Sequence, residues 1–146
     1  MHIIQVSDRL SVAAQPHPGA FPELAAAGFA SIVNNRPDGE DAAQPGTEAE
    51  AAAAKAAGLG YVHIPVSMTS ITEADVRHFQ STLSLADGPV LAHCKSGMRS
   101  LMLWSIGEVL DGRMRAEDVQ AFGARHGIDL RAAVAWLARH GGRTQV

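Results

Sequence analysis

Short apolar runs alternate with helical segments along the chain, and this order limits the folds that it can adopt. Runs typical of strands occupy residues 2–6, 10–13, 30–34, 61–66 and 90–93. Segments typical of helices occupy residues 21–28, 47–57, 72–86, 98–110, 116–125 and 130–139, and Thr72 with Asp75 predicts a capping box at one of them. This alternation predicts an α/β fold with a central, mostly parallel sheet flanked by helices. Ligands of such sheets bind at the carboxyl ends of the strands.

Residues 93–100, His-Cys-Lys-Ser-Gly-Met-Arg-Ser, join the strand at 90–93 to the next helix and contain the only cysteine, Cys94. Backbone N–H groups at a helix start lack intrahelical partners and can converge on an anion. Arg99 adds a planar set of donors suited to a tetrahedral oxyanion. We therefore predict that Cys94 is a catalytic nucleophile and that Arg99 holds the substrate. The same pattern assigns substrate binding to Lys95, Ser96, Gly97, Met98 and Ser100.

A simpler interpretation is that Cys94 is a small buried hydrophobic residue at the end of a core strand. Its neighbours favour catalysis, because Ser96 and Gly97 allow close backbone approach. Ser100 also places a hydroxyl where it can hydrogen-bond the sulfur and ease its departure.

Composition excludes several classes of protein. A chain of 146 residues with 47% apolar residues fits one domain, residues 1–146, with its own core. The net charge of −3 argues against nucleic acid as a partner. One cysteine excludes an internal disulfide, and the sequence has neither a secretory signal nor an apolar run of about 18 residues. We expect a cytoplasmic protein that does not bind membranes.

The histidines lack metal-ligand spacing, so we expect no metal site and no cofactor. His93 directly precedes Cys94 on a predicted strand, where alternation turns its ring away from the cysteine side chain. The sequence therefore predicts that His93 orders the loop through hydrogen bonds.

Several ordered motifs in residues 10–110 resemble the phosphatase-like domain of the bacterial beta-lactamase-hydrolase-like family, which is similar in fold to dual-specificity cysteine phosphatases. The motifs are Ala-Gln-Pro at 14–16, Ile-Val-Asn-Asn-Arg-Pro-Asp-Gly-Glu at 32–40, His-Ile-Pro-Val at 63–66, and residues 88–100. The resemblance implies a cysteine-phosphatase-like fold, a Cys94 nucleophile and an Arg99 oxyanion clamp.

The sequence departs from the wider phosphatase pattern at two places. Cysteine phosphatases have five residues between nucleophile and arginine, whereas four separate Cys94 from Arg99. A loop of this length resembles that of single-domain rhodanese sulfurtransferases, where it holds a cysteine persulfide. Dual-specificity phosphatases also carry an aspartate general acid after the strand that corresponds to 63–66, where this chain has Ser-Met-Thr-Ser at 67–70.

Asp38 is the best substitute for that acid, because residues 34–38 leave a core strand at the same crevice edge. Arg36 would bind substrate beside it. Glu40, Glu73 and Asp75 are weaker candidates. The alternative is that residues 36–38 form a turn with a local ion pair.

Three functions fit these residues. The first is hydrolysis of phosphate esters through a cysteinyl-phosphate, weak on alkyl esters because a missing general acid costs on the order of 10²- to 10⁴-fold in rate. The second is sulfur transfer, in which Cys94 takes the sulfane sulfur of thiosulfate or a small persulfide. The third is a non-catalytic oxyanion-binding module. The overall resemblance favours the first function, whereas loop length and the missing aspartate favour the second, and we place phosphate-ester hydrolysis first by a narrow margin. Each implies a small anionic ligand.

Overall fold

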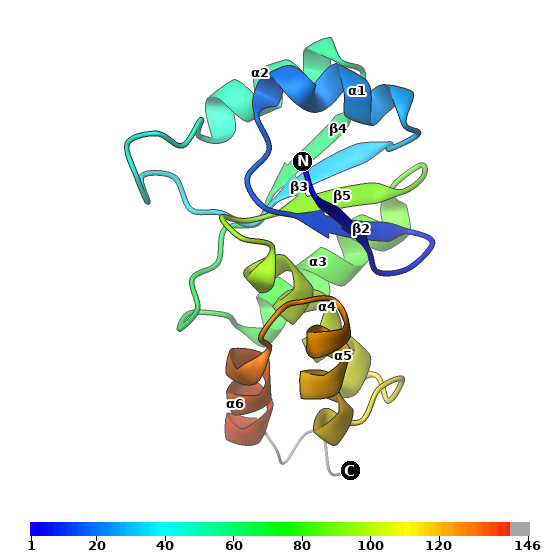
Figure 1. The fold of residues 1–146 in the computed structure, drawn as a ribbon, viewed down its shortest axis with the longest axis vertical. Helices are drawn as coiled ribbons and strands as arrows, with labels where there is room; N and C mark the ends of the chain where they lie inside the picture. Colours follow the sequence, from blue (N-terminus) through cyan, green and yellow to red (C-terminus); the bar gives the residue numbers. More distant parts are fainter. Residues whose placement is uncertain (141–146) are drawn as a thin grey trace.

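The computed structural model describes residues 1–140, which form one five-stranded sheet with helices on both faces (Figure 1). The strands are β1 (Ile3–Gln5), β2 (Leu10–Ala13), β3 (Ser31–Asn34), β4 (Gly60–His63) and β5 (Val90–His93). Their order is β1-β2-β5-β3-β4. Only β1, at the edge, is antiparallel to its neighbour, and the other pairs are parallel. The predicted α/β fold with a mostly parallel sheet is confirmed.

The helices pack on the two faces of the sheet in separate groups (Figure 1). They are η1 (Pro18–Ala20), α1 (Phe21–Ala26), α2 (Thr47–Ala56), α3 (Glu73–Leu85), α4 (Met98–Leu110), η2 (Ala116–Asp118), α5 (Val119–Arg125) and α6 (Arg131–Arg139). On one face, α1 and α2 supply Phe21, Leu24 and Ala54 to a small core. On the other face, α3 to α6 form the larger core around Phe79 and Trp136. Burial on both faces explains why β2, β3 and β5 are entirely buried.

Most predicted boundaries agree with the structure, but the strand predicted over 61–66 ends at His63. Pro65 has no N–H to donate to a neighbouring strand. The chain nevertheless continues beside β3, because Ile64 N donates to Asn34 O (2.9 Å) and Val66 N donates to Asn35 O (3.1 Å). These bonds bring the segment after β4 to the edge of the sheet where β3 and β5 end.

Two central strands end side by side at this edge. Asn34 of β3 lies opposite His93 of β5, and Asn35 N donates to His93 O at 2.7 Å. The residues that follow these strands, Asn35 with Arg36 and Cys94 with its loop, therefore meet at the carboxyl ends of the parallel strands.

Candidate active site

Cys94 is fully buried at the base of the loop between β5 and α4. Gly97 N donates to Cys94 Sγ at 3.1 Å, so the loop turns a backbone donor toward the sulfur. This turn requires Gly97 at φ +97°, in the left-handed region that side chains rarely adopt. At least one backbone N–H of the loop therefore faces the sulfur.

Arg99, in the first turn of α4, is held by two segments from other parts of the chain. Its Nη1 donates to Glu40 Oε2 (2.6 Å) and to Val66 O (3.0 Å), and its Nη2 donates to Glu40 Oε1 (3.0 Å). Hydrogen bonding to Glu40 raises the pKa of Arg99, burial opposes this effect, and the electrostatic interaction with the Cys94 side chain adds to it. The guanidinium thus lies within electrostatic reach of the sulfur.

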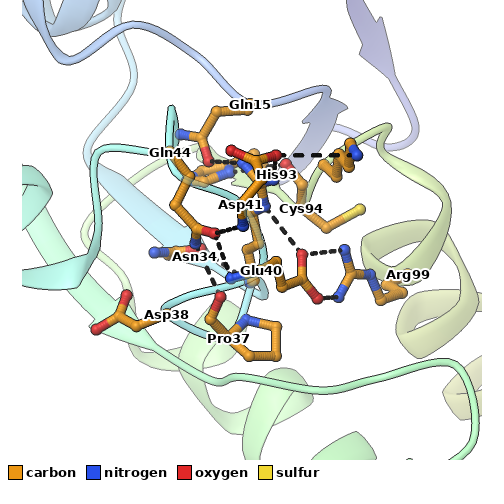
Figure 2. A network of polar contacts seen from close by, with 12 residues as sticks. Gln15, Asn34, Pro37, Asp38, Glu40, Asp41, Gln44, His93, Cys94 and Arg99 are labelled. Atoms are coloured by element: carbon orange, nitrogen blue, oxygen red, sulfur yellow. Dashed lines mark hydrogen bonds and ion pairs between the residues drawn. The ribbon is translucent and has the colours of Figure 1, made fainter.

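Glu40 is shared by two arginines, and Figure 2 shows its contact with one of them, Arg99. Besides Arg99 it contacts Arg36, whose Nε lies 2.9 Å from Glu40 Oε1. Hydrogen bonds from Arg99 and then Arg36 lower the pKa of Glu40 from its ordinary value of 4.5 to about 2, against the opposing effect of burial. Glu40 is therefore an anion at neutral pH and has no proton to give to a leaving group.

Arg36 is almost fully buried and serves as a support rather than as an exposed substrate contact. In addition to Glu40, its guanidinium bonds Asp41 Oδ2 (2.6 Å) and Gln15 Oε1 (3.1 Å). These contacts give no support to the predicted role in substrate binding, because the side chains of Glu40 and Asp41 accept hydrogen bonds from the Arg36 guanidinium.

Asp38 does not join Cys94 in the structure. Its Oδ1 accepts a hydrogen bond from Thr47 N at 2.8 Å, at the start of α2. In Figure 2 its carboxylate points away from Cys94 and Arg99. The weaker candidates also have structural partners: Asp75 closes the capping box of α3, and Glu73 pairs with Arg77. These contacts give no support to the predicted acid role of Asp38.

Ser100 contacts a different group from the one expected. Its hydroxyl donates to Asn35 Oδ1 at 2.7 Å, and Asn35 Nδ2 in turn donates to Ile64 O at 3.0 Å. The single hydroxyl proton of Ser100 is therefore directed to the loop after β3 rather than to the sulfur.

His93 is fully buried and bonded on both ring nitrogens. Its Nδ1 lies 3.1 Å from Cys94 O, and its Nε2 lies 2.6 Å from Glu50 Oε1. Glu50, also fully buried, accepts a further bond from Gln15 Nε2 at 2.9 Å. These contacts support the predicted loop-ordering role of His93. Sequence analysis missed Glu50, since nothing in an alanine-rich helix distinguishes an inward-facing glutamate from a solvated one.

An open pocket of about 1080 Å³ lies over the loop. It is lined by Ala14, Glu40, Ser67, Met68, Thr69, Lys95, Ser96, Met98 and Arg99. Met68 belongs to residues 67–70, where the resemblance to dual-specificity phosphatases implies an aspartate. The pocket therefore combines the charged side chains of Glu40, Lys95 and Arg99 with an apolar rim.

Within residues 1–140, no cluster of three or more histidine, cysteine or acidic side chains is arranged to hold a metal ion. In the same part of the chain, none of the helices has the length and apolar character needed to cross a membrane.

Comparison with known proteins gives consistent matches. Residues 2–111 match the family model described as beta-lactamase hydrolase-like protein, phosphatase-like domain. A beta-lactamase hydrolase-like protein of Agrobacterium fabrum is 52% identical over 95% of this chain, and one of Xylella fastidiosa is 50% identical over the same share. The chain spans about a third, 32%, of the length of these relatives.

Solved structures share the fold. The crystal structure of a protein from Neisseria meningitidis, described as a proposed phosphatase, superposes with a TM-score of 0.84 at 28% identity, covering 94% of this chain and 96% of that one. P. aeruginosa TpbA in complex with phosphotyrosine superposes with a TM-score of 0.70 at 20% identity, covering 91% and 80% of the two chains. The fold is that of cysteine phosphatases.

Proposed function

The chain belongs to the family of phosphatase-like domains of beta-lactamase hydrolase-like proteins, and we propose that it uses Cys94 for sulfur transfer from a small anionic donor. One observation carries the proposal: the carboxylate bonded to Arg99, that of Glu40, is ionised and cannot act as a general acid. The site thus suits leaving groups that depart without a proton.

Sulfur transfer has such leaving groups. The Cys94 thiolate attacks the sulfane sulfur of thiosulfate, a new S–S bond forms at Sγ, and the old S–S bond breaks as sulfite leaves with its electron pair. An acceptor thiolate or cyanide then attacks the outer sulfur of the persulfide and restores the Cys94 thiolate. Both steps exchange one stable anion for another, so neither requires a proton at the leaving atom.

The loop supplies what this reaction needs. Gly97 N–H donates to Sγ and would stabilise either the thiolate or the persulfide anion that replaces it. Arg99 offers its remaining donors to the oxygens of a thiosulfate. The four-residue spacing between Cys94 and Arg99, similar to the rhodanese loop, agrees with this assignment.

The second candidate is hydrolysis of phosphate esters, and the fold favours it. The phosphotyrosine complex of TpbA indicates that a protein of this fold can bind an aryl phosphate. An aryl oxide is a better leaving group than an alkoxide and depends less on a general acid. Cys94 and Arg99 would serve as nucleophile and oxyanion clamp in that reaction as well.

Whole-protein mass spectrometry separates the two reactions. We expect wild-type protein exposed to thiosulfate to gain one sulfur atom and Cys94→Ser to gain none. The double variant Cys94→Ser, Ser84→Cys is the matched control, because it carries its thiol on an exposed part of α3, and it should also gain none. Phosphate release from an aryl phosphate that depends on Cys94, without sulfur gain, would assign hydrolysis instead.

A further inference from the structure

We propose that Glu40 sets the charge of the ligand that the Cys94 loop accepts, so that singly charged anions are favoured over doubly charged ones. If the proposed sulfur transfer is correct, a persulfide anion is a better donor than thiosulfate, which the site accepts more weakly. The inference about the substrate rests on the proposed function, whereas the selectivity itself is measurable without turnover.

The contacts of Arg99 show that Glu40 does not block the ligand site. A guanidinium carries five N–H donors. Glu40 and Val66 O take both donors of Nη1 and one of Nη2. The other edge of the guanidinium, Nε–H and the second Nη2–H, has no oxygen acceptor among residues 1–140, and the Cys94 side chain also hydrogen-bonds the guanidinium. A ligand that takes the place of the sulfur at this edge leaves the Glu40 contacts intact.

Glu40 does, however, change the charge that the ligand meets. Arg36, Arg99 and Lys95 form ion pairs with Glu40 and Asp41, which leaves one net positive charge in this cluster before the Cys94 sulfur is counted. The Cys94 thiolate of the proposed reaction balances that charge, so every negative charge of the ligand is uncompensated beside a carboxylate that is only partly exposed. A monoanion brings one such charge and a dianion brings two. Repulsion between like charges is strong where water is partly excluded. The loop amides favour both kinds of ligand and do not remove the difference.

The surroundings allow the charge of Glu40 to be removed without dismantling the site. In Glu40→Gln, Arg99 keeps its bond to Val66 O, and Arg36 keeps Asp41 and Gln15. The main change is then the loss of one negative charge next to Arg99.

Sulfate and perchlorate provide a matched pair of tetrahedral anions that differ by one charge. We would measure their dissociation constants by titration calorimetry on the full, reduced chain. We expect Glu40→Gln to bind sulfate roughly tenfold more tightly than wild type and to improve perchlorate binding clearly less. Glu48→Gln removes the same charge from an exposed position in the first turn of α2, and it should change neither value.

Three outcomes would overturn the proposal. The first is that Glu40→Gln weakens the binding of sulfate and of perchlorate equally, which would make Glu40 only a positioning residue for Arg99. The second is that binding changes but the ratio of the two dissociation constants stays as in wild type. The third is that neither Glu40 variant binds sulfate. Glu40→Ala makes the same charge change and replaces Glu40→Gln if that variant does not fold, as judged by its thermal melting. No sulfur is transferred in the calorimetric assay. A protein that gains no sulfur from a donor would therefore leave the measured charge selectivity unaffected.

Discussion

Buried hydrogen bonds between individual side chains hold the Cys94 loop at the end of β5. Glu50 accepts from Gln15 Nε2 through one carboxylate oxygen and lies 2.6 Å from His93 Nε2 through the other. Both Glu50 and His93 are fully buried, so a group left without its partner there cannot turn to water instead. The position of Cys94 therefore depends on a helix, α2, that contributes no residue to the pocket.

Glu50→Gln tests this dependence at a single residue. The glutamine has one acceptor oxygen and an amide donor, so it loses either the bonds from Gln15 and Asn34 or the bond that the carboxylate makes with His93. We expect a loss of about 1–3 kcal/mol in the free energy of unfolding, measured by urea denaturation. We also expect a lower rate of sulfur gain at Cys94. Glu48→Gln, on the exposed side of the same helix, should change neither, and an equal effect of both variants would contradict the prediction.

At the scale of a secondary-structure element, helix ends are determined by short local patterns. Thr72 Oγ1 accepts from Asp75 N (3.1 Å) and Asp75 Oδ2 accepts from Thr72 N (2.9 Å), which confirms the predicted capping box of α3. The bounds of α2, α4 and α6 also follow the predicted segments. Local signals of this kind lie within a few residues of one another, and the sequence displays them directly.

Thr72→Ala removes the side-chain part of this cap. We expect it to lower the free energy of unfolding by about 1 kcal/mol, seen as a lower urea midpoint with an unchanged slope. Thr82→Ala makes the same replacement in the last turn of α3, where the hydroxyl only bonds His78 O, and it should have little effect. A cap variant as stable as wild type would show that tertiary packing alone determines where α3 begins.

At the scale of the whole molecule, the stability of the fold at acid pH depends on carboxylates that pair with arginines in different parts of the chain. The pKa of Glu40 is lowered to about 2, first by Arg99. The pKa values of Asp41 and Asp111 are lowered chiefly by hydrogen bonds from Arg36 and Arg77. A carboxyl whose pKa is lower in the folded protein contributes stability above its unfolded pKa and loses it as the pH falls through the folded value. Stability should therefore decline as the pH falls from about 4.5 toward 2.

Urea midpoints measured from pH 7 to pH 2.5 check this expectation. In Glu40→Gln the part of the decline that belongs to Glu40 is absent, so the midpoint should fall less steeply below pH 4.5 than in wild type. Glu48→Gln should retain the wild-type slope. Equal slopes for wild type and Glu40→Gln would contradict the assignment of Glu40 as the strongly shifted carboxyl.

The sequence by itself determined the order of strands and helices, the parallel α/β class and the loop that carries Cys94 and Arg99, because each depends on periodicity or on residues close together in the chain. Only the tertiary structure decided which carboxylate accompanies Arg99. Asp38 and Glu40 leave the same strand, but Asp38 turns to Thr47 at the start of α2, and Glu40 reaches an arginine 59 positions later. Glu50 and His93, 43 positions apart, meet for the same reason. Such pairs form only when the sheet brings distant segments to one edge, and no local pattern records which of several acidic side chains will face inward.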